Sequence, residues 1–222
     1  MHDPQQASQA IPTAQPPKLS DTAFVFDLDG GRPCLDFANT LTSSGVDHLA
    51  TYTDLVAFAD QSELITPFDA VWLQAEGERD PLIAQGVVVR ARRLRAAMRA
   101  IFAAIALDET PSDHDLSVLN FDLAASLGHA RVVPQGEGGY RWGWAGRNLD
   151  APLWPITRSA ADVLTSDAER RLVRQCGASD CSWLFVDTTR NRSRQWCSMA
   201  SCGNREKARR HYQRQRANRE TA

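Results

Sequence analysis

Lysine and long apolar runs are the two things this chain of 222 residues most conspicuously lacks. Only two of its 25 basic residues are lysines, so almost all of its positive charge sits on arginine. No stretch of about 18 apolar residues occurs, which excludes a hydrophobic membrane span. The Gln-, Ala- and Pro-rich start has neither the basic nor the apolar region of a secretory signal. We therefore expect a disordered lead-in over residues 1–20, a cytoplasmic location and no membrane partner.

The motifs that most often carry catalysis are also missing. We find no glycine-rich phosphate loop, no Ser/His/Asp or Cys/His set, and no chelating pair among the five histidines. The segment "FVFDLDGG" is similar to the Asp-x-Asp-Gly motif of haloacid-dehalogenase-type phosphatases. That chemistry needs a lysine downstream, and the only one, Lys207, lies in the cysteine-rich region. We interpret Asp27 and Asp29 as turn or capping residues and expect no enzyme.

The net charge of −2 conceals an uneven distribution. Residues 170–222 contain 13 basic and 4 acidic residues, whereas residues 1–169 contain 12 basic and 23 acidic ones. Such asymmetry favours a chain with two functional parts, of which the second binds a polyanion. The alternative is that the two parts dock on each other.

Hydrophobic periodicity predicts a mainly helical first part. Helices are expected within 53–64, 68–78, 82–107, 110–128 and 151–166, the longest being 82–107. The segment 22–31 reads as a strand and a turn, 33–41 as a strand or the start of a helix, and 130–146 as a hairpin around "QGEGG". Asp113, His114 and Asp115 are expected to cap a helix rather than bind a metal. The arginines between 90 and 99 are expected to form a solvated face that pairs with local acids, or a second anion-binding surface.

Aromatic residues alternate along one predicted strand. Tyr140, Trp142 and Trp144 share a face of it, which favours a place in the hydrophobic core, with a ligand pocket or binding platform as the alternative. The overall expectation is an α+β, mainly α fold. Residues 21–168 would form the helical domain with small β elements, and residues 169–222 a small module of a β-hairpin and a helix.

Four of the five cysteines lie in that second module. Their spacing is Cys176-x4-Cys181-x15-Cys197-x4-Cys202, and clustered cysteines without an export signal are more often metal ligands than disulfides. We predict one closed, structural Zn²⁺ site formed by four thiolates. His211, the competing ligand, falls too far into the predicted C-terminal helix. Cys34 is expected to be a small buried apolar residue.

Local patterns around these cysteines predict the module's shape. Residues 182–196 would form a hairpin between the two cysteine pairs, with a strand, a polar turn and a return strand. Gly203 would allow a tight backbone, and Asn204 would cap the helix that follows. Delivery of Cys202 to a helix N-terminus would favour its thiolate form.

The cysteine module resembles the CGNR zinc finger, whose tetrapeptide stands here as Cys202-Gly203-Asn204-Arg205. The opening "FVFDLDGGRPCLDFANTL" is similar to that of the ABATE domain, which precedes this finger in bacterial proteins. The resemblance implies that Cys176, Cys181, Cys197 and Cys202 bind zinc and that the protein is a stress-induced transcription regulator, or binds RNA. Ser182 departs from the family pattern, which often has Gly after the second cysteine.

The basic residues of the module predict its partner. Arginine forks match phosphate geometry, and an aromatic residue such as Trp196 can stack on a base. Glu206 and Arg210 are expected to pair, and Ala208 and Tyr212 to lie against the finger. The predicted nucleic-acid contacts, to DNA or RNA, are Arg190, Arg192, Arg194, Asn204, Arg205, Lys207, Arg209, Arg210, Arg214 and Arg216.

Two further expectations complete the sequence-based interpretation. The N-terminal domain is expected to sense a small-molecule effector or to form a homodimer. The alternative function is that of a protein-interaction adaptor, whose basic finger binds an acidic partner or the protein's own acidic first part.

Overall fold

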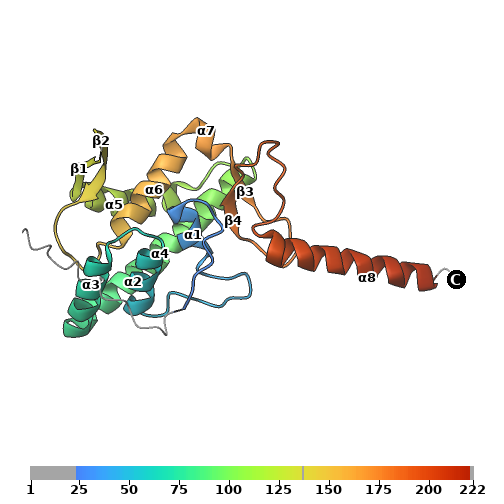
Figure 1. Cartoon of the computed structure of the whole chain (residues 1–222), viewed down its shortest axis with the longest axis horizontal. Helices are drawn as coiled ribbons and strands as arrows, with labels where there is room; N and C mark the ends of the chain where they lie inside the picture. Colours follow the sequence, from blue (N-terminus) through green and yellow to red (C-terminus); the bar gives the residue numbers. More distant parts are fainter. Residues whose placement is uncertain (1–23, 137, 221–222) are drawn as a thin grey trace, which may run out of the picture.

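The computed structural model describes residues 24–136 and 138–220, which form a mainly helical body and a projecting C-terminal helix (Figure 1). The helices of the body are α1 (Pro33–Asn39), α2 (Tyr52–Gln61), α3 (Pro67–Arg79), α4 (Pro81–Ala106), α5 (Asp113–Leu127), α6 (Leu153–Thr165) and α7 (Asp167–Arg170). Two antiparallel strand pairs join them, β1 (Ala130–Gln135) with β2 (Gly139–Trp144), and β3 (Val173–Gln175) with β4 (Leu184–Val186). A short π-helical turn, η1 (Met199–Gly203), leads into α8 (Asn204–Glu220). The α+β, mainly α prediction is confirmed.

Capping and periodicity explain where the helices form. Thr51 and Asp54 make a reciprocal capping box at the start of α2, and the Ser112 side chain accepts from the backbone N–H of Asp115 at the start of α5. The apolar stripe of α4 is buried and packs against α1, α2, α3 and α5, so this helix organises the core. The predicted helices are all present, and the acidic residues at 113–115 open a helix as expected.

The segment before α1 does not form the strand that its β-branched and aromatic residues predict. Residues 24–28 have no strand partner, and the backbone N–H of Phe26 donates to the Gln61 side chain at 2.9 Å instead. Residues 33–39 are helical, because Pro33 at the first turn and the buried face of Leu35 and Phe37 favour a helix packed on the core.

The arginines of α4 mostly hold the body together rather than face solvent. Arg90 binds Asp122 and Asp150, and Arg95 is only 4% exposed and forms a fork with Asp47. The pairing with local acids is therefore confirmed, whereas the solvated face is wrong for Arg95. These ion pairs fasten the loop around residue 47 and helix α5 to α4.

The β1–β2 hairpin stands at one end of the body, far from α8 (Figure 1). Its aromatic residues do not enter the core as the alternation predicts, because Tyr140 is 72% and Trp142 45% exposed. Trp142 instead stacks on the guanidinium of Arg158 at 4.2 Å. Trp144 is half-buried and meets Trp154 of α6, the helix that also carries Arg158.

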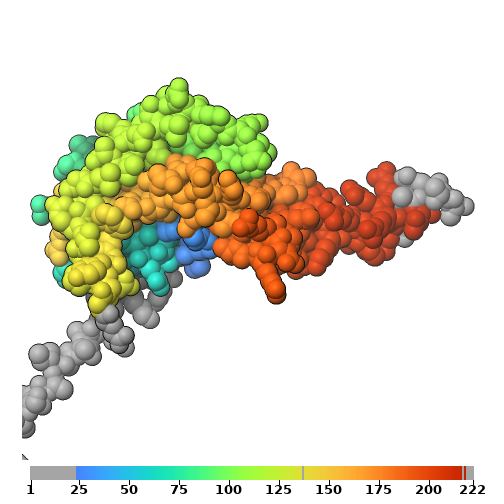
Figure 2. All heavy atoms as spheres, turned by 90° about the horizontal axis from the view of Figure 1, so that it is seen from above, coloured from blue at the N-terminus to red at the C-terminus, as the bar shows by residue number. Residues whose placement is uncertain are grey.

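Helix α8 extends away from the body in both views of the molecule (Figures 1 and 2). It therefore does not lie on the acidic first part of the chain, as the self-docking alternative would require. Among the residues described, no helix has both the length and the apolar character needed to cross a bilayer.

Candidate metal centre and basic helix

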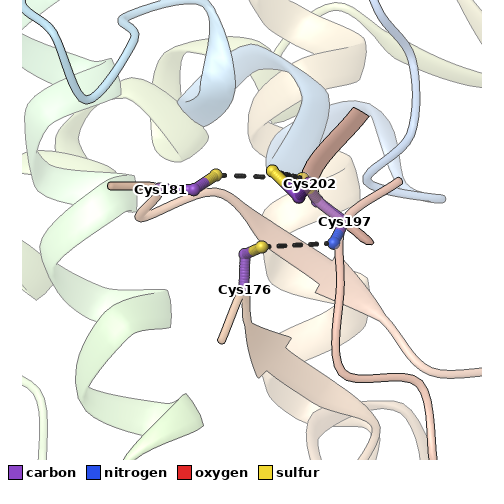
Figure 3. A group of neighbouring side chains, drawn as sticks. All are labelled: Cys176, Cys181, Cys197 and Cys202. Carbon is purple, nitrogen blue, oxygen red and sulfur yellow. Dashed lines mark hydrogen bonds between the residues drawn. The ribbon is translucent and has the colours of Figure 1, made fainter. Parts of the chain in front are cut away.

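The two cysteine pairs of the finger come together beside β3 and β4 (Figure 3). Cys176 follows β3 and Cys181 precedes β4, Cys197 lies in the loop before η1, and Cys202 lies within η1. Each offers one sulfur, and the four sulfurs lie within 4.8 Å of one another. A Zn–S bond of about 2.3 Å in a tetrahedron places sulfurs about 3.8 Å apart. The separations of 3.8 Å (Cys181 to Cys197) and 3.5 Å (Cys197 to Cys202) fit this spacing.

The charge of these thiols shows why the cluster suits a cation. A hydrogen bond from the Cys197 thiol lowers the pKa of Cys181 to about 5, so Cys181 is the first cysteine of the cluster to lose its proton. The same contact raises the pKa of Cys197, because its thiol donates to the Cys181 thiolate and lies among negative neighbours. A bound Zn²⁺ reverses the second effect and allows all four sulfurs to be deprotonated. Four thiolates close the coordination shell, so the centre is one structural zinc site.

The two strands of the finger pair differently from the sequence-based expectation. The prediction placed a hairpin between the cysteine pairs, but β4 pairs with β3, and the first cysteine pair forms the loop between them. Residues 187–194 form a polar turn without a return strand. Asp187, which is fully buried, accepts there from the backbone N–H of Thr189 at 2.9 Å and of Arg194 at 3.0 Å. A buried carboxylate that collects such donors holds a turn in place of strand pairing.

The start of the C-terminal helix also differs in detail. Helix α8 begins at Asn204 directly from the π-helical turn, and the Asn204 side chain donates to the carbonyl of Ala200 at 3.2 Å, so it is not the predicted N-cap. Gly203 is needed for space rather than for an unusual backbone angle. A Cβ there would come within 2.8 Å of the sulfur of Met199 and 3.1 Å of the Trp196 ring.

Two residues of the first helical turn fasten α8 to the finger. The guanidinium of Arg205 donates to Asp180 at 3.0 Å and to the Cys202 sulfur at 3.2 Å, so it supports a zinc ligand. Glu206, only 7% exposed, pairs with Arg209 rather than with the predicted Arg210, and accepts weakly from the backbone N–H of Ser179 at 3.4 Å. Glu206, an acidic residue among the basic residues of α8, thus helps to attach the helix to the finger.

Arg194 has a structural role that its sequence position does not reveal. Its guanidinium lies over the Phe185 ring at 4.3 Å and donates to the carbonyls of Trp196 at 3.0 Å and Asp29 at 2.9 Å. It also donates to the carbonyl of Cys197. These bonds leave Arg194 poorly placed to contact a nucleic acid.

The other predicted contact residues divide between the finger and the helix surface. Arg209 is tied to Glu206, and Arg210 lies 5.8 Å from the centre of the Trp196 ring. Ala208 and Tyr212 are exposed, so the expectation that they pack on the finger is wrong. His211 is exposed and bonds Gln215, away from the cysteines. The predicted contacts with exposed side chains are Arg190, Arg192, Asn204, Arg205, Lys207, Arg210, Arg214 and Arg216.

Sequence reasoning missed the residue that joins the first part to the finger. The buried amide of Asn39 accepts from the backbone N–H of Leu184 at 2.9 Å and donates to its carbonyl at 2.8 Å. Next to it, the N–H of Val186 donates to the carbonyl of Gly30 at 2.9 Å, and Asp36 accepts from the N–H of Gly30 at 2.7 Å. The signal was present, since Asn39 and Asp36 both belong to the segment that carries the N-terminal resemblance.

Comparison with known families agrees with this architecture. Residues 31–167 match the ABATE family, described as "putative stress-induced transcription regulator", and residues 172–215 match the CGNR zinc finger. A search of curated proteins finds no match. The two matched regions meet where β3 begins, just after α7.

Proposed function

Because the chain belongs to the ABATE family and ends in a CGNR zinc finger, we propose that it is a cytoplasmic transcription regulator that binds nucleic acid through α8. The observation that carries the proposal is the placement of α8. It is held at its first turn by the zinc centre and then projects from the body (Figure 2). Its exposed basic side chains include Lys207, Arg210 and Arg214. Single-sign charge on an unsupported helix is destabilising until an anion neutralises it.

The dimensions of the helix suit a nucleic-acid groove. Its 17 residues span about 26 Å, long enough to cross a major groove about 12 Å wide. Lys207, Arg210 and Arg214 are exposed and would contact phosphates. Arg190 and Arg192, in the turn before Cys197, would add contacts from the finger itself.

The role proposed for the zinc is structural, and we propose no catalytic activity. Four thiolates leave no coordination position for water or substrate. The metal would instead fix the direction in which α8 leaves the finger. The support for this role is the bond from Arg205 to a zinc ligand, which ties the helix to the coordination shell.

Fluorescence anisotropy of the zinc-loaded protein with random duplex DNA and with single-stranded RNA tests the proposal. The variant Lys207→Gln/Arg210→Gln/Arg214→Gln is expected to bind at least tenfold more weakly. Its log K on duplex DNA should also depend less on log salt, by about 0.9 for each phosphate that the variant no longer neutralises. The control Arg79→Gln/Arg93→Gln/Arg131→Gln removes three exposed charges from the body and should bind like the parent.

Two outcomes would overturn nucleic-acid binding. One is the absence of binding to either probe at low salt with zinc content verified, which would favour an acidic protein partner. The other is an equal reduction of affinity in both triple variants, which would show attraction by net charge without a site on α8.

A further inference from the structure

A hollow lies beneath the β1–β2 hairpin, at the opposite end of the body from α8. It has a volume of about 710 Å³ and lies between the hairpin, the α2–α3 connection and the start of α6. A second hollow of about 470 Å³ continues from it towards α7 and shares Glu63, Leu64, Arg141 and Trp144 in its lining. The volume of the first hollow is typical of sites for small molecules.

The lining combines aromatic walls with an arginine that has no acid partner. Trp72, Trp144 and Trp154 line the first hollow, together with Leu64 and Ile65. Arg147, at its edge, lies over the rings of Phe68 at 5.0 Å and Trp72 at 5.6 Å. Within residues 24–136 and 138–220 it forms no salt bridge or hydrogen bond, whereas the arginines of α4 that line the core are bonded.

The surroundings of Arg147 determine what it can bind. Its guanidinium lies near two aromatic rings and has no hydrogen-bond partner among the described residues, so its N–H groups are available for a fork to a carboxylate. Arg141 lines the same hollow, and the only hydrogen bond of its guanidinium in the described chain is to the carbonyl of the adjacent Trp142 at 3.3 Å. Glu63 and Asp69 also line it, but Asp69 is occupied by the Thr66 hydroxyl at 2.6 Å.

A further polar group in the lining is unsatisfied. The indole Nε1–H of Trp154 is a buried donor without an acceptor among the described residues, although its ring is stacked on His129 at 3.9 Å. Such groups in native proteins usually have a water or ligand partner. The aromatic walls and the unpaired N–H donors of Arg147 and Trp154 are together complementary to an anion that carries a flat aromatic ring.

We propose that this hollow binds a small aromatic carboxylate, with its ring against the tryptophan-lined wall and its carboxylate on Arg147. Arg141 would provide a second positive charge at the entrance. The site is independent of the nucleic-acid interface proposed above, because none of its lining residues belongs to the finger or to α8.

Isothermal titration of the zinc-loaded full chain with 1-naphthoate and benzoate tests the site, with 1-naphthylmethanol as the neutral match. We expect both carboxylates to bind, the larger ring more tightly, and the alcohol at least tenfold more weakly than 1-naphthoate. Arg147→Gln should weaken 1-naphthoate binding about tenfold or more, the loss typical of a charged hydrogen bond. Arg93→Gln removes an equivalent exposed charge from α4 and should leave the affinity unchanged.

A fourth probe tests whether the site prefers a plain carboxylate or a zwitterion. L-Tryptophan carries an ammonium group that could pair with the Glu63 carboxylate, which has no partner among the described residues. If this zwitterion bound more tightly than 1-naphthoate, and Glu63→Gln removed the difference, the result would contradict a plain carboxylate site. Failure of both carboxylates to bind at millimolar concentration would overturn the proposal. Equal affinity for the acid and the alcohol, or an Arg147→Gln variant that binds like the parent, would do the same.

Discussion

The buried carboxylate of Asp36 fixes the conformation of the backbone segment to which strand β4 of the finger is hydrogen-bonded. Asp36 is 8% exposed, and its carboxylate accepts from the backbone N–H of Gly30, whose carbonyl in turn receives the N–H of Val186. A side chain at Gly30 would come within 2.8 Å of the Asp36 carboxylate oxygen, so this glycine is required for close approach. Asp36 therefore positions a backbone segment that the finger uses as a partner.

Asp36 should also give the fold a recognisable pH dependence. Burial raises the pKa of its carboxyl to about 6 in the folded chain, above the ordinary value of about 3.9. The folded state thus holds a proton that the unfolded state releases, and the contribution of Asp36 to stability falls as pH rises from about 4 to about 6. Relative to Asp36→Asn, the parent's free energy of unfolding should fall by up to about 3 kcal/mol over that range.

The measurement is denaturant unfolding of both zinc-loaded proteins between pH 4 and 7. Because both contain the same cysteines, release of zinc at low pH affects them alike and cancels in the difference. A difference that does not vary with pH would show that Asp36 titrates at its ordinary value.

At the scale of elements, the finger depends on its metal more than on its strands. The β3–β4 pair is only three residues long in each strand, and the apolar cluster around the cysteines contains few large side chains. The metal must therefore supply much of the stability that a larger core would otherwise give.

Replacement of Cys197 by Ser tests this dependence. The Cys197 sulfur lies within 3.8 Å of two other sulfurs of the cluster, so its removal should abolish stoichiometric zinc binding and lower the melting temperature. Zinc content measured by atomic emission should fall from one ion per chain to a small fraction. Cys34→Ala, which removes the buried thiol outside the cluster, should keep one zinc even if it destabilises the core. Retention of a full zinc by Cys197→Ser would exclude it from the ligand set.

Whether a feature could be predicted from the sequence depends on how far apart in the chain its interacting residues lie. Most helices, the first hairpin and the cysteine cluster depend on local periodicity, turn residues and spacing, and the sequence predicts them. It leaves α1 open between a strand and a helix, and it does not predict the short helix α7. Strand pairing in the finger depends on distant contacts. The pattern of residues 182–196 therefore predicts a hairpin with a return strand, whereas Asp187 and Arg194 hold a polar turn in its place. The exposure of Tyr140 and Trp142 could not be predicted either, because alternation along a strand does not say which face meets a core.

At the scale of the molecule, the two family regions share one hydrophobic core. Val173, Leu184 and Val186 of the finger strands pack into the cluster formed by α1, α2, α4 and α6, while Phe185 between them faces the cysteines. The same short strand thus contributes to both sides of the boundary. Arg32 of the loop before α1 also forms a forked ion pair with Glu169 of α7, in the segment that joins the two regions. The finger is therefore attached rigidly to the helical body.

Because the finger is attached to the body in this way, a substitution at the boundary should lower the unfolding free energy of the whole chain. Asn39→Ala leaves the buried N–H and carbonyl of Leu184 without partners, which should cost about 2–4 kcal/mol of unfolding free energy. Since the two regions share a core, unfolding followed by helix circular dichroism and by zinc release should remain one coincident transition, shifted to lower denaturant. Asn120→Ala, at an exposed position on α5, should change stability by no more than about 0.5 kcal/mol. If Asn39→Ala instead released zinc in a separate early transition while the helices melted unchanged, the finger would be an independent unit and the shared core would not couple it to the body.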